Sequence, residues 1–152
     1  MKVDALGFLL HLYYGARVSG IMEYLLTYYD RGFSGNPADA GNDRTYSLDA
    51  LPQEYPQAGA GDYRSAALVI RNADGSEYCD LRYVSHEIKR GKYALKGLPA
   101  VYAADDEAET LEITLEDPVG GVLVRLWYGV LEEDDIITRS AEIRNTGSDP
   151  IC

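Results

Sequence analysis

Residues 110–145 read TLEITLEDPVGGVLVRLWYGVLEEDDIITRSAEIRN, and this stretch decides the fold class. In its first seven residues Thr and Glu alternate with Leu and Ile, which predicts a strand with one wet face and one buried face. Turn residues follow at 117–121, and the chain returns with Val, Leu or Tyr at every second position of 122–130. A third alternating segment, 136–145, comes after four acidic residues. We therefore expect consecutive antiparallel strands joined by turns.

Strand-like segments also precede this stretch. Residues 8–14 and 24–29 are the first two expected strands, and residues 65–71 and 77–88 flank an Asp74-Gly75 hairpin signal. No convincing amphipathic helix separates these segments. The pattern predicts an all-β fold, an antiparallel β-sandwich, formed as a single domain over residues 1–152.

Residues 31–63 interrupt the pattern with a segment rich in Gly, Pro, Asn, Asp and Ala. It is far longer than the ~12–15 residues beyond which structureless loops become uncommon and are usually functional. Five apolar side chains are expected to anchor it: Phe33, Tyr46, Leu48, Leu51 and Tyr55. We also expect Ser47-Leu48-Asp49 to start a short helical turn.

Composition and charge exclude several classes of function. The chain has 152 residues and a formal charge of -11, so neither a nucleic-acid backbone nor an anionic membrane surface is an expected partner. No apolar run approaches the roughly 20 residues that span a bilayer, and the first residues lack a signal-peptide layout. We expect a cytoplasmic protein. Cys79 and Cys152 have neither the number nor the spacing of a disulfide framework or a zinc site.

The aromatic composition is unusual, with 13 Tyr against two Phe and one Trp. Tyr packs like Phe and keeps a hydroxyl for polar partners, a balance that carbohydrate-binding surfaces favour. A β-rich fold that uses Tyr for its strand propensity would explain the same composition.

No constellation of catalytic or metal-binding residues emerges from the sequence. Residues 105–107 and 132–135 are acidic but fall in expected turns, where adjacent carboxylates are solvated and nothing separates their pKa values. His11 and His86 are isolated within strand patterns, without ligand spacing. We assign no catalytic residue, no metal site and no cofactor.

Eight short motifs are spread along the chain: FSGNP at 33–37, DRTYSLD at 43–49, LPQEYP at 51–56, DYR at 62–64, DLRY at 80–83, GLPA at 97–100, EAETL at 107–111 and ITRS at 137–140. Together they resemble the N-terminal domain of bacterial α-galactosidases of glycoside hydrolase family thirty-six. The resemblance covers essentially the whole chain. It implies a supersandwich of the galactose-mutarotase-like type, truncated here at both ends and followed in the family by a (β/α)₈ barrel that carries the two catalytic aspartates.

The resemblance also implies partners and a site. Members hydrolyse galactosides such as melibiose and raffinose, form oligomers, with a homotetramer expected, and extend this long loop to a neighbouring subunit's active site. It implies a substrate contact for Asp30, and Arg44 is a second candidate. From spacing alone, an intraloop salt bridge or a helix cap would explain both residues. The alternative function is a stand-alone β-sandwich that binds carbohydrate or protein without catalysis.

Overall fold

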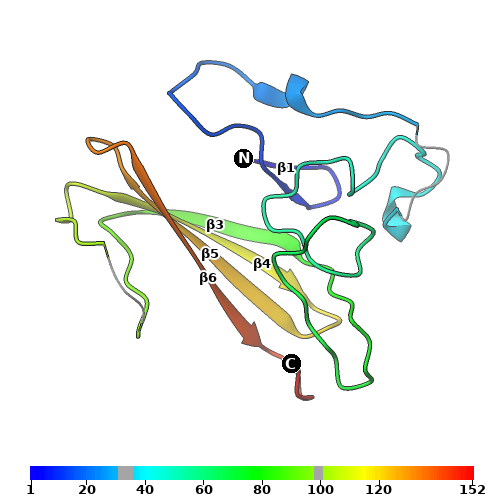
Figure 1. The fold of residues 1–152 in the computed structure, drawn as a ribbon. Coiled ribbons are helices and arrows are strands. Elements are labelled where there is room, and N and C mark those ends of the chain that lie inside the picture. The colour runs from blue at the N-terminus through cyan, green and yellow to red at the C-terminus, as the bar shows by residue number, and fades with distance from the viewer. Residues whose placement is uncertain (31–35, 98–100) are drawn as a thin grey trace.

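The computed structural model describes residues 1–30, 36–97 and 101–152, and its regular elements are almost all strands (Figure 1). The elements in chain order are β1 (Lys2–Val3), β2 (Leu9–Leu10), η1 (Met22–Leu25), η2 (Ala38–Ala40), β3 (Arg82–Arg90), β4 (Glu109–Asp117), β5 (Val122–Leu131) and β6 (Ile136–Asn145). The two η elements are single turns of 3₁₀ helix. The strands form two antiparallel sheets, β1-β2 and β3-β4-β5-β6, which confirms the all-β antiparallel class.

The four-stranded sheet has the two faces that the sequence alternation predicts. On one face, Ile113 pairs with Leu126, and Leu115 pairs with Val124, which in turn pairs with Ile143 on β6. The first four of these side chains are at most 3% exposed. The opposite face carries charged side chains that form ion pairs from strand to strand. Strands β4, β5 and β6 and their two turns are therefore confirmed.

Thr110 lies on the polar face, yet it is only 2% exposed. Its hydroxyl donates a hydrogen bond to the Gly91 carbonyl at 2.7 Å and accepts one from the Tyr93 amide at 3.0 Å. The segment after β3 therefore folds over this end of the sheet. The alternation of polar and apolar residues within one strand does not predict that another segment covers its polar face.

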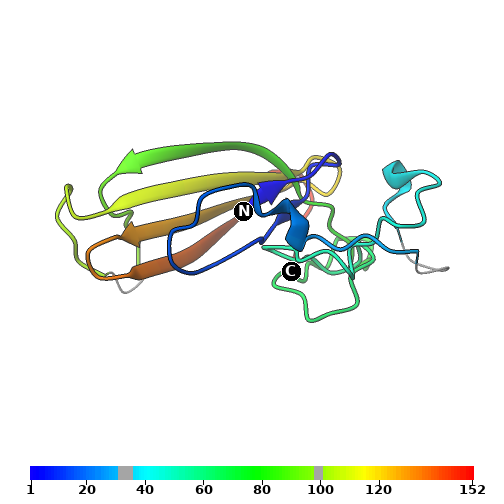
Figure 2. The same ribbon diagram turned by 90° about the horizontal axis from the view of Figure 1, so that it is seen from above.

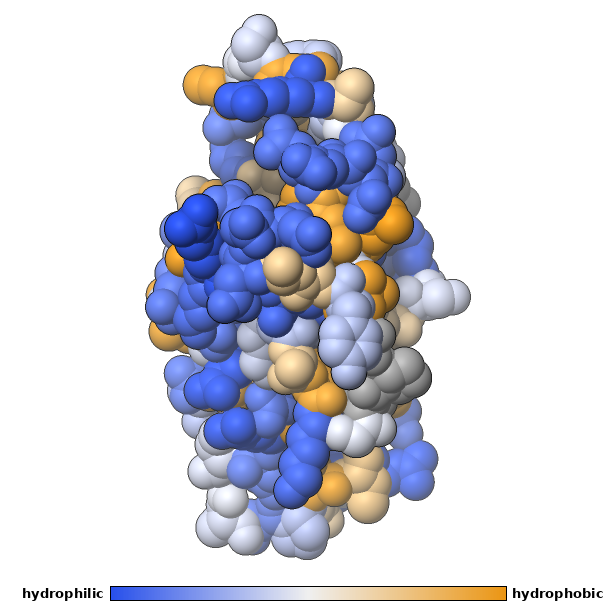
Figure 3. Space-filling view, turned by 90° about the vertical axis from the view of Figure 1, so that its left-hand side faces the viewer, coloured by the Kyte–Doolittle hydropathy of each residue, from blue (hydrophilic) through white to orange (hydrophobic). Residues whose placement is uncertain are grey.

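The apolar face of the large sheet is covered by a layer that is mostly irregular. Leu9 of β2 and the side chains of Ile70, Cys79 and Leu81 pack against the buried residues of β4 and β5. Figures 1 and 2 show that β1, β2 and the irregular segments lie toward one end of the sheet. Toward the other end of the same face, Ile88 remains 66% exposed. Seen from that side, the surface is mainly hydrophilic with scattered hydrophobic patches (Figure 3).

The prediction of a strand over residues 24–29 is wrong. Residues 22–25 form η1, and the residues that follow are irregular. Ile21 and Tyr24 are 77% and 75% exposed, whereas Leu26 alone in this stretch is buried. A strand needs a neighbour for its backbone groups, and the described part of the chain pairs none with this segment. The predicted strand 8–14 is shortened to β2 for the same reason, although Leu10 also bridges to Gln53.

Residues 65–71 and 77–81 are not strands either. In the first segment, Leu68 forms an isolated bridge with Gln57, and Arg71 exchanges two backbone hydrogen bonds with Cys152. In the second, the Cys79 amide donates to the Ala58 carbonyl. These contacts are single and point to different neighbours, so no continuous ladder forms. The Asp74-Gly75 turn itself is present, since the Asn72 amide donates to the Ser76 carbonyl.

Apart from the single turn η2, the long segment predicted over residues 31–63 is irregular where the structure describes it, from residue 36 onward. Its anchors are confirmed: Tyr46, Leu48 and Leu51 are buried in a second apolar cluster with Phe8 and Leu10. Tyr55 packs, half-buried, against the main core, and Phe33 lies outside the described residues. The helical turn at Ser47 is present as one turn, because the amides of residues 50 and 51 both donate to the Ser47 carbonyl.

The length and hydrophobicity of the described helices decide whether any of them could span a membrane. Across residues 1–30, 36–97 and 101–152, no helix has the length and apolar character needed to span a bilayer.

Candidate functional site

Asp30 and Arg44, the two predicted substrate-binding residues, lie in direct contact. Arg44 Nε donates a hydrogen bond to Asp30 Oδ1 at 3.2 Å, and Nη2 lies 3.1 Å from the same oxygen. The Asp30 and Arg44 side chains are 52% and 64% exposed. An ion pair this exposed stabilises the fold by about 1 kcal/mol at most.

The backbone beside Arg44 is ordered by Asp43. Its Oδ1 accepts hydrogen bonds from the Thr45 amide at 2.9 Å and the Thr45 hydroxyl at 2.7 Å. Because these donors favour the ionised form, they hold the pKa of Asp43 below its usual value. The Asp43 carbonyl accepts from Asn36 Nδ2. The guanidinium of Arg44 thus projects from a loop whose turn geometry is fixed locally.

A buried carboxylate that the sequence did not single out joins the two layers. Glu54 is 2% exposed at its side chain, and its Oε1 accepts hydrogen bonds from Tyr128 Oη at 2.8 Å and from Arg139 Nη2. Its Oε2 lies 2.6 Å from His11 Nδ1. Burial, and then the nearby charge of Glu54, raise the pKa of Tyr128. In the sequence, Glu54 stands out only by its position between two prolines in 51–56. That pattern does not indicate which side chains bind the carboxylate.

A second buried carboxylate, Asp62, organises the irregular layer. It accepts hydrogen bonds from Gln53 Nε2 at 2.8 Å and from the amide and Nε of Arg64 at 3.0 and 2.9 Å. Burial raises the pKa of this carboxyl, but the hydrogen bonds from Arg64 and Gln53 outweigh it and hold the pKa of Asp62 below its usual value. Arg64 Nη2 also donates to the carbonyls of Leu48 and Leu51.

Arg82, at the start of β3, connects the sheet to the N-terminal segments. Its guanidinium binds Asp80 and Asp39 at 2.7 and 2.9 Å, donates to the Leu6 carbonyl and lies 3.9 Å from the centre of the Phe8 ring. Burial opposes its charge, but the hydrogen bonds to the two aspartates raise the pKa of Arg82 above its usual value. This cluster is fully engaged within the chain and is structural.

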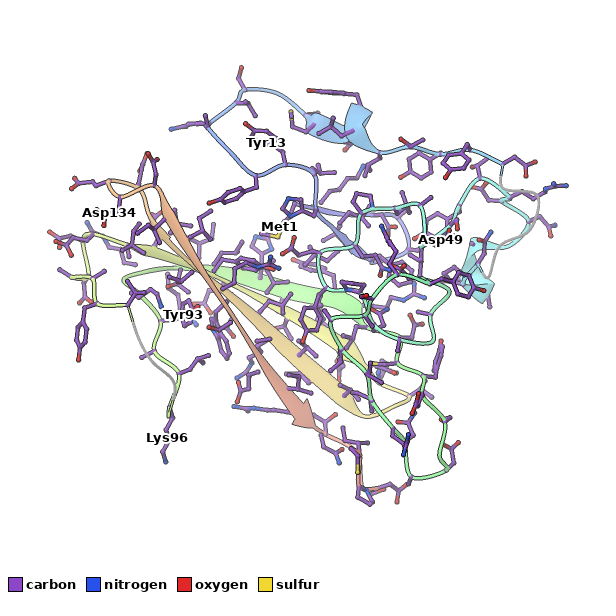
Figure 4. The ribbon with its side chains drawn as sticks, viewed as in Figure 1. Met1, Tyr13, Asp49, Tyr93, Lys96 and Asp134 are labelled. Atoms are coloured by element: carbon purple, nitrogen blue, oxygen red, sulfur yellow. The ribbon has the colours of Figure 1, made fainter. Side chains whose placement is uncertain are left out.

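The remaining candidates do not converge on a reactive site. The acidic groups at 105–107 and 132–135 are exposed in turns, as predicted. Figure 4 shows Asp134 at the tip of the β5–β6 hairpin, far from Asp49 in the irregular layer. His86 Nδ1 lies 2.6 Å from the Tyr83 hydroxyl on the same exposed strand. Within the described ranges, no group of three or more His, Cys, Asp or Glu side chains could hold a metal ion.

The buried cysteine has no feature of a reactive thiol. Cys79 is buried in the core, and Cys152 is exposed; both are free. Burial, followed by the charge of Asp117, raises the pKa of Cys79 to about 12. Its thiol is therefore protonated and inert at neutral pH.

The sequence model of the glycosyl hydrolase family 36 N-terminal domain matches residues 7–152. The chain belongs to this family. It is 62% identical over 99% of its length to the bifunctional α-galactosidase/sucrose kinase AgaSK of Mediterraneibacter gnavus. It is 43% identical over 98% of its length to the α-galactosidase AgaA of Geobacillus stearothermophilus.

Solved structures agree with the family 36 assignment. The galactosidase domain of AgaSK superimposes with a TM-score of 0.96 over 99% of the chain. A variant of AgaA in complex with raffinose superimposes with a TM-score of 0.92 at 42% identity over the same share. The chain spans 16% of AgaSK and 20% of AgaA in sequence, and 21% of each solved chain. The family 36 domain is thus a small part of each of these proteins.

Proposed function

We propose that this family 36 domain is the N-terminal, non-catalytic part of a longer α-galactosidase that removes terminal α-D-galactosyl residues from melibiose- and raffinose-type oligosaccharides. The observation that carries the proposal is the match over essentially the whole chain to α-galactosidases, at up to 62% identity among the relatives described above. A retaining glycosidase needs two carboxyl groups ~5–5.5 Å apart on either side of the scissile bond. Those groups belong to the catalytic barrel of the longer protein, which acts in the cytoplasm.

In this proposal the Asp30–Arg44 pair completes the sugar pocket of a neighbouring subunit in a homotetramer. A carboxylate accepts hydrogen bonds from sugar hydroxyls, and a guanidinium donates hydrogen bonds to sugar oxygens. Together the two groups can therefore bind sugar hydroxyls both as donors and as acceptors. Their mutual ion pair, more than half exposed, keeps them oriented until a ligand replaces it.

The test uses the longer protein that carries this domain. Asp30→Ala should lower kcat/KM for galactosides by roughly one to two decades, because losing a charged hydrogen-bond partner costs on the order of 1.5–3 kcal/mol. Asp134→Ala, at the exposed hairpin tip, is the matched control and should leave kcat/KM unchanged. Full activity of Asp30→Ala would reduce the residue to a structural ion pair.

The subunit boundary has its own test. Mixing Asp30→Ala subunits with subunits inactivated in the barrel should restore part of the activity in hybrid tetramers. Loss of activity in Asp30→Ala without such rescue would place the contact within the residue's own subunit.

The 152-residue chain alone should not hydrolyse p-nitrophenyl α-galactoside, because the nucleophile and the acid/base lie in the barrel. Turnover that follows the protein peak through purification would contradict this. The alternative, a stand-alone binding module, would be supported by a stop codon directly after the codon of Cys152.

A further inference from the structure

A cleft of about 400 Å³ is lined by two exposed tyrosines, and neither Asp30 nor Arg44 belongs to its lining. Tyr63 and Tyr78 contribute its aromatic walls and are 76% and 48% exposed. Residues 36–38, residues 59–62 and Asp80 complete the lining. Neither tyrosine belongs to the apolar cores, so packing does not explain why two large rings border one hollow.

Tyr63 is held rigidly despite its exposure. It lies between Asp62 and Arg64, and the Asp62 carboxylate accepts hydrogen bonds from both the amide and the side chain of Arg64. Arg64 also binds two carbonyls of the buried turn before it. The backbone that presents the Tyr63 ring is therefore held by the Asp62–Arg64 ion pair, whose two members lie on either side of it, which lowers the entropy lost when a ligand stacks on the ring.

Tyr78 is held by a close backbone approach. A Cβ placed on Gly59 would lie 2.6 Å from the Glu77 carbonyl oxygen, 2.9 Å from Tyr78 Cα and 3.2 Å from its ring, and Gly59 has φ +89°. The Tyr78 carbonyl accepts from Asn72 Nδ2, and the next amide donates to the Ala58 carbonyl. Because Gly59 has no side chain, its backbone can lie in close contact with the backbone of residues 77 and 78. This contact positions the Tyr78 ring beside the cleft.

The chemistry of the cleft selects its ligand class. The two carboxylates of the lining, Asp62 and Asp80, are already bound by Arg64 and Arg82, and the described lining residues include no Lys or Arg. With a net charge of -11 on the chain as well, a phosphate or another anion is a poor ligand for this cleft. Aromatic faces bind flat apolar surfaces, while phenol hydroxyls bind hydroxyl groups. A pyranose ring offers an apolar face and a rim of hydroxyls, and it is neutral.

Tyr78 also borders a second hollow, of about 680 Å³, on the way to the β4–β5 turn. Its lining includes the hydroxyl side chains of Ser76, Thr146 and Ser148. Two adjoining hollows that share one aromatic wall suit a ligand of several linked units better than a single small molecule.

We propose that the Tyr63–Tyr78 cleft is an accessory carbohydrate subsite that binds neutral oligosaccharides, separate from the pocket to which Asp30 and Arg44 contribute. The choice of galactosides as the first ligands to test rests on the proposed function. The subsite would hold sugar units of an oligosaccharide close to the enzyme without taking part in hydrolysis.

The experiment is a titration of the 152-residue chain, labelled at its tyrosine rings, with raffinose and stachyose by NMR. Wild type should bind in the millimolar range, with shifts at Tyr63 and Tyr78. Tyr63→Ala and Tyr78→Ala should each weaken binding about tenfold, the loss of roughly one aromatic stacking contact. Tyr63→Phe and Tyr78→Phe keep the ring and should lose less.

The matched control is Tyr102→Ala, because this ring is 97% exposed and lies outside both hollows. It should bind as wild type does, and all variants should keep the wild-type thermal midpoint. Equal binding by wild type and Tyr78→Ala, or no shift at either ring up to about 50 mM sugar, would overturn the subsite.

The two proposals fail separately. Hydrolysis of galactosides by the longer protein tests the proposed function, whereas sugar binding by this chain tests the cleft. Sugar binding by a protein without galactosidase activity would sink the proposed function and leave the subsite standing. Galactosidase activity without Tyr63 and Tyr78 shifts would do the reverse.

Discussion

The four-stranded sheet and the irregular layer that covers it are stabilised in different ways. In β3 to β6 the backbone groups pair with each other along continuous antiparallel ladders, and alternate side chains form the core. In residues 36–81 the ladders are absent, and buried side chains take over. Asp62 and Arg64 bind backbone groups there, and Glu54 joins this layer to β5 and β6.

The difference follows from the need to satisfy buried backbone groups. A strand with neighbours satisfies them by repetition, so its side chains need only alternate. An irregular segment over a core has no repeating partner, so each turn depends on a particular side chain. We expect substitutions in the irregular layer to act through single polar anchors, and those in the sheet through many small contacts.

The largest expected effect is at the anchor that joins the two regions. Glu54→Ala removes the carboxylate that accepts hydrogen bonds from the buried Tyr128 hydroxyl and from Arg139. Because each hydrogen bond to a charged group contributes about 1.5–3 kcal/mol, losing both should cost about 3–5 kcal/mol. Urea unfolding of the 152-residue chain measures the loss. Glu132→Ala, in an exposed turn, is the control and should change stability by no more than about 0.5 kcal/mol. Equal stability of the two variants would remove Glu54 from its anchoring role.

The next effect concerns the close approach inside the irregular layer. Gly59→Ala places a Cβ 2.6 Å from a backbone oxygen at φ +89°, so steric overlap adds to backbone strain and about 2–4 kcal/mol should be lost. Gly75→Ala has φ +85° but nothing within 4 Å of the added atom, so it isolates the strain alone, about 1–2 kcal/mol. Thermal unfolding that ranks Gly75→Ala as the worse variant would refute the close approach.

A smaller effect is the acid sensitivity of the irregular layer. The pKa of Asp62 is held below its unfolded value of about 3.9, so its contribution is present above that pH and is lost as the pH falls through the folded-state value. Asp62→Asn should therefore flatten the decline in unfolding free energy below about pH 4, and cost about 1–3 kcal/mol at neutral pH. Unfolding in urea at pH 7, 4 and 3 measures both. An unchanged acid slope would contradict the buried ion pair.

The smallest effect belongs to the polar face of the sheet. Arg125 on β5 stands directly opposite Glu142 on β6, with their charged atoms 3.9 Å apart. A double-mutant cycle on this partly exposed pair should give a coupling of about 0.2–1 kcal/mol that falls as salt is added. A coupling above about 2 kcal/mol, or one insensitive to salt, would show that the sheet also depends on single anchors.

Several features were predictable from the sequence because they are local. The alternation in 110–145 identified β4, β5 and β6 and their faces, since a period of two residues is itself the geometry of a strand with one buried side. The apolar anchors Tyr46, Leu48 and Leu51 were predictable from their hydrophobicity within a polar segment. The resemblance of the scattered motifs also identified the family, which the match over residues 7–152 confirms.

Tertiary structure decided what depends on distant partners. Strand propensity in 24–29 had no neighbouring strand to pair with among the described residues, so the segment formed the end of η1 and an irregular stretch instead of a strand. The contact between Asp30 and Arg44, 14 residues apart, and the three donors around Glu54, drawn from up to 85 residues away, arise only when the chain folds. A sequence records which side chains can donate or accept, but only the packed layers bring a buried carboxylate to its donors, because water satisfies these groups equally well in the unfolded chain.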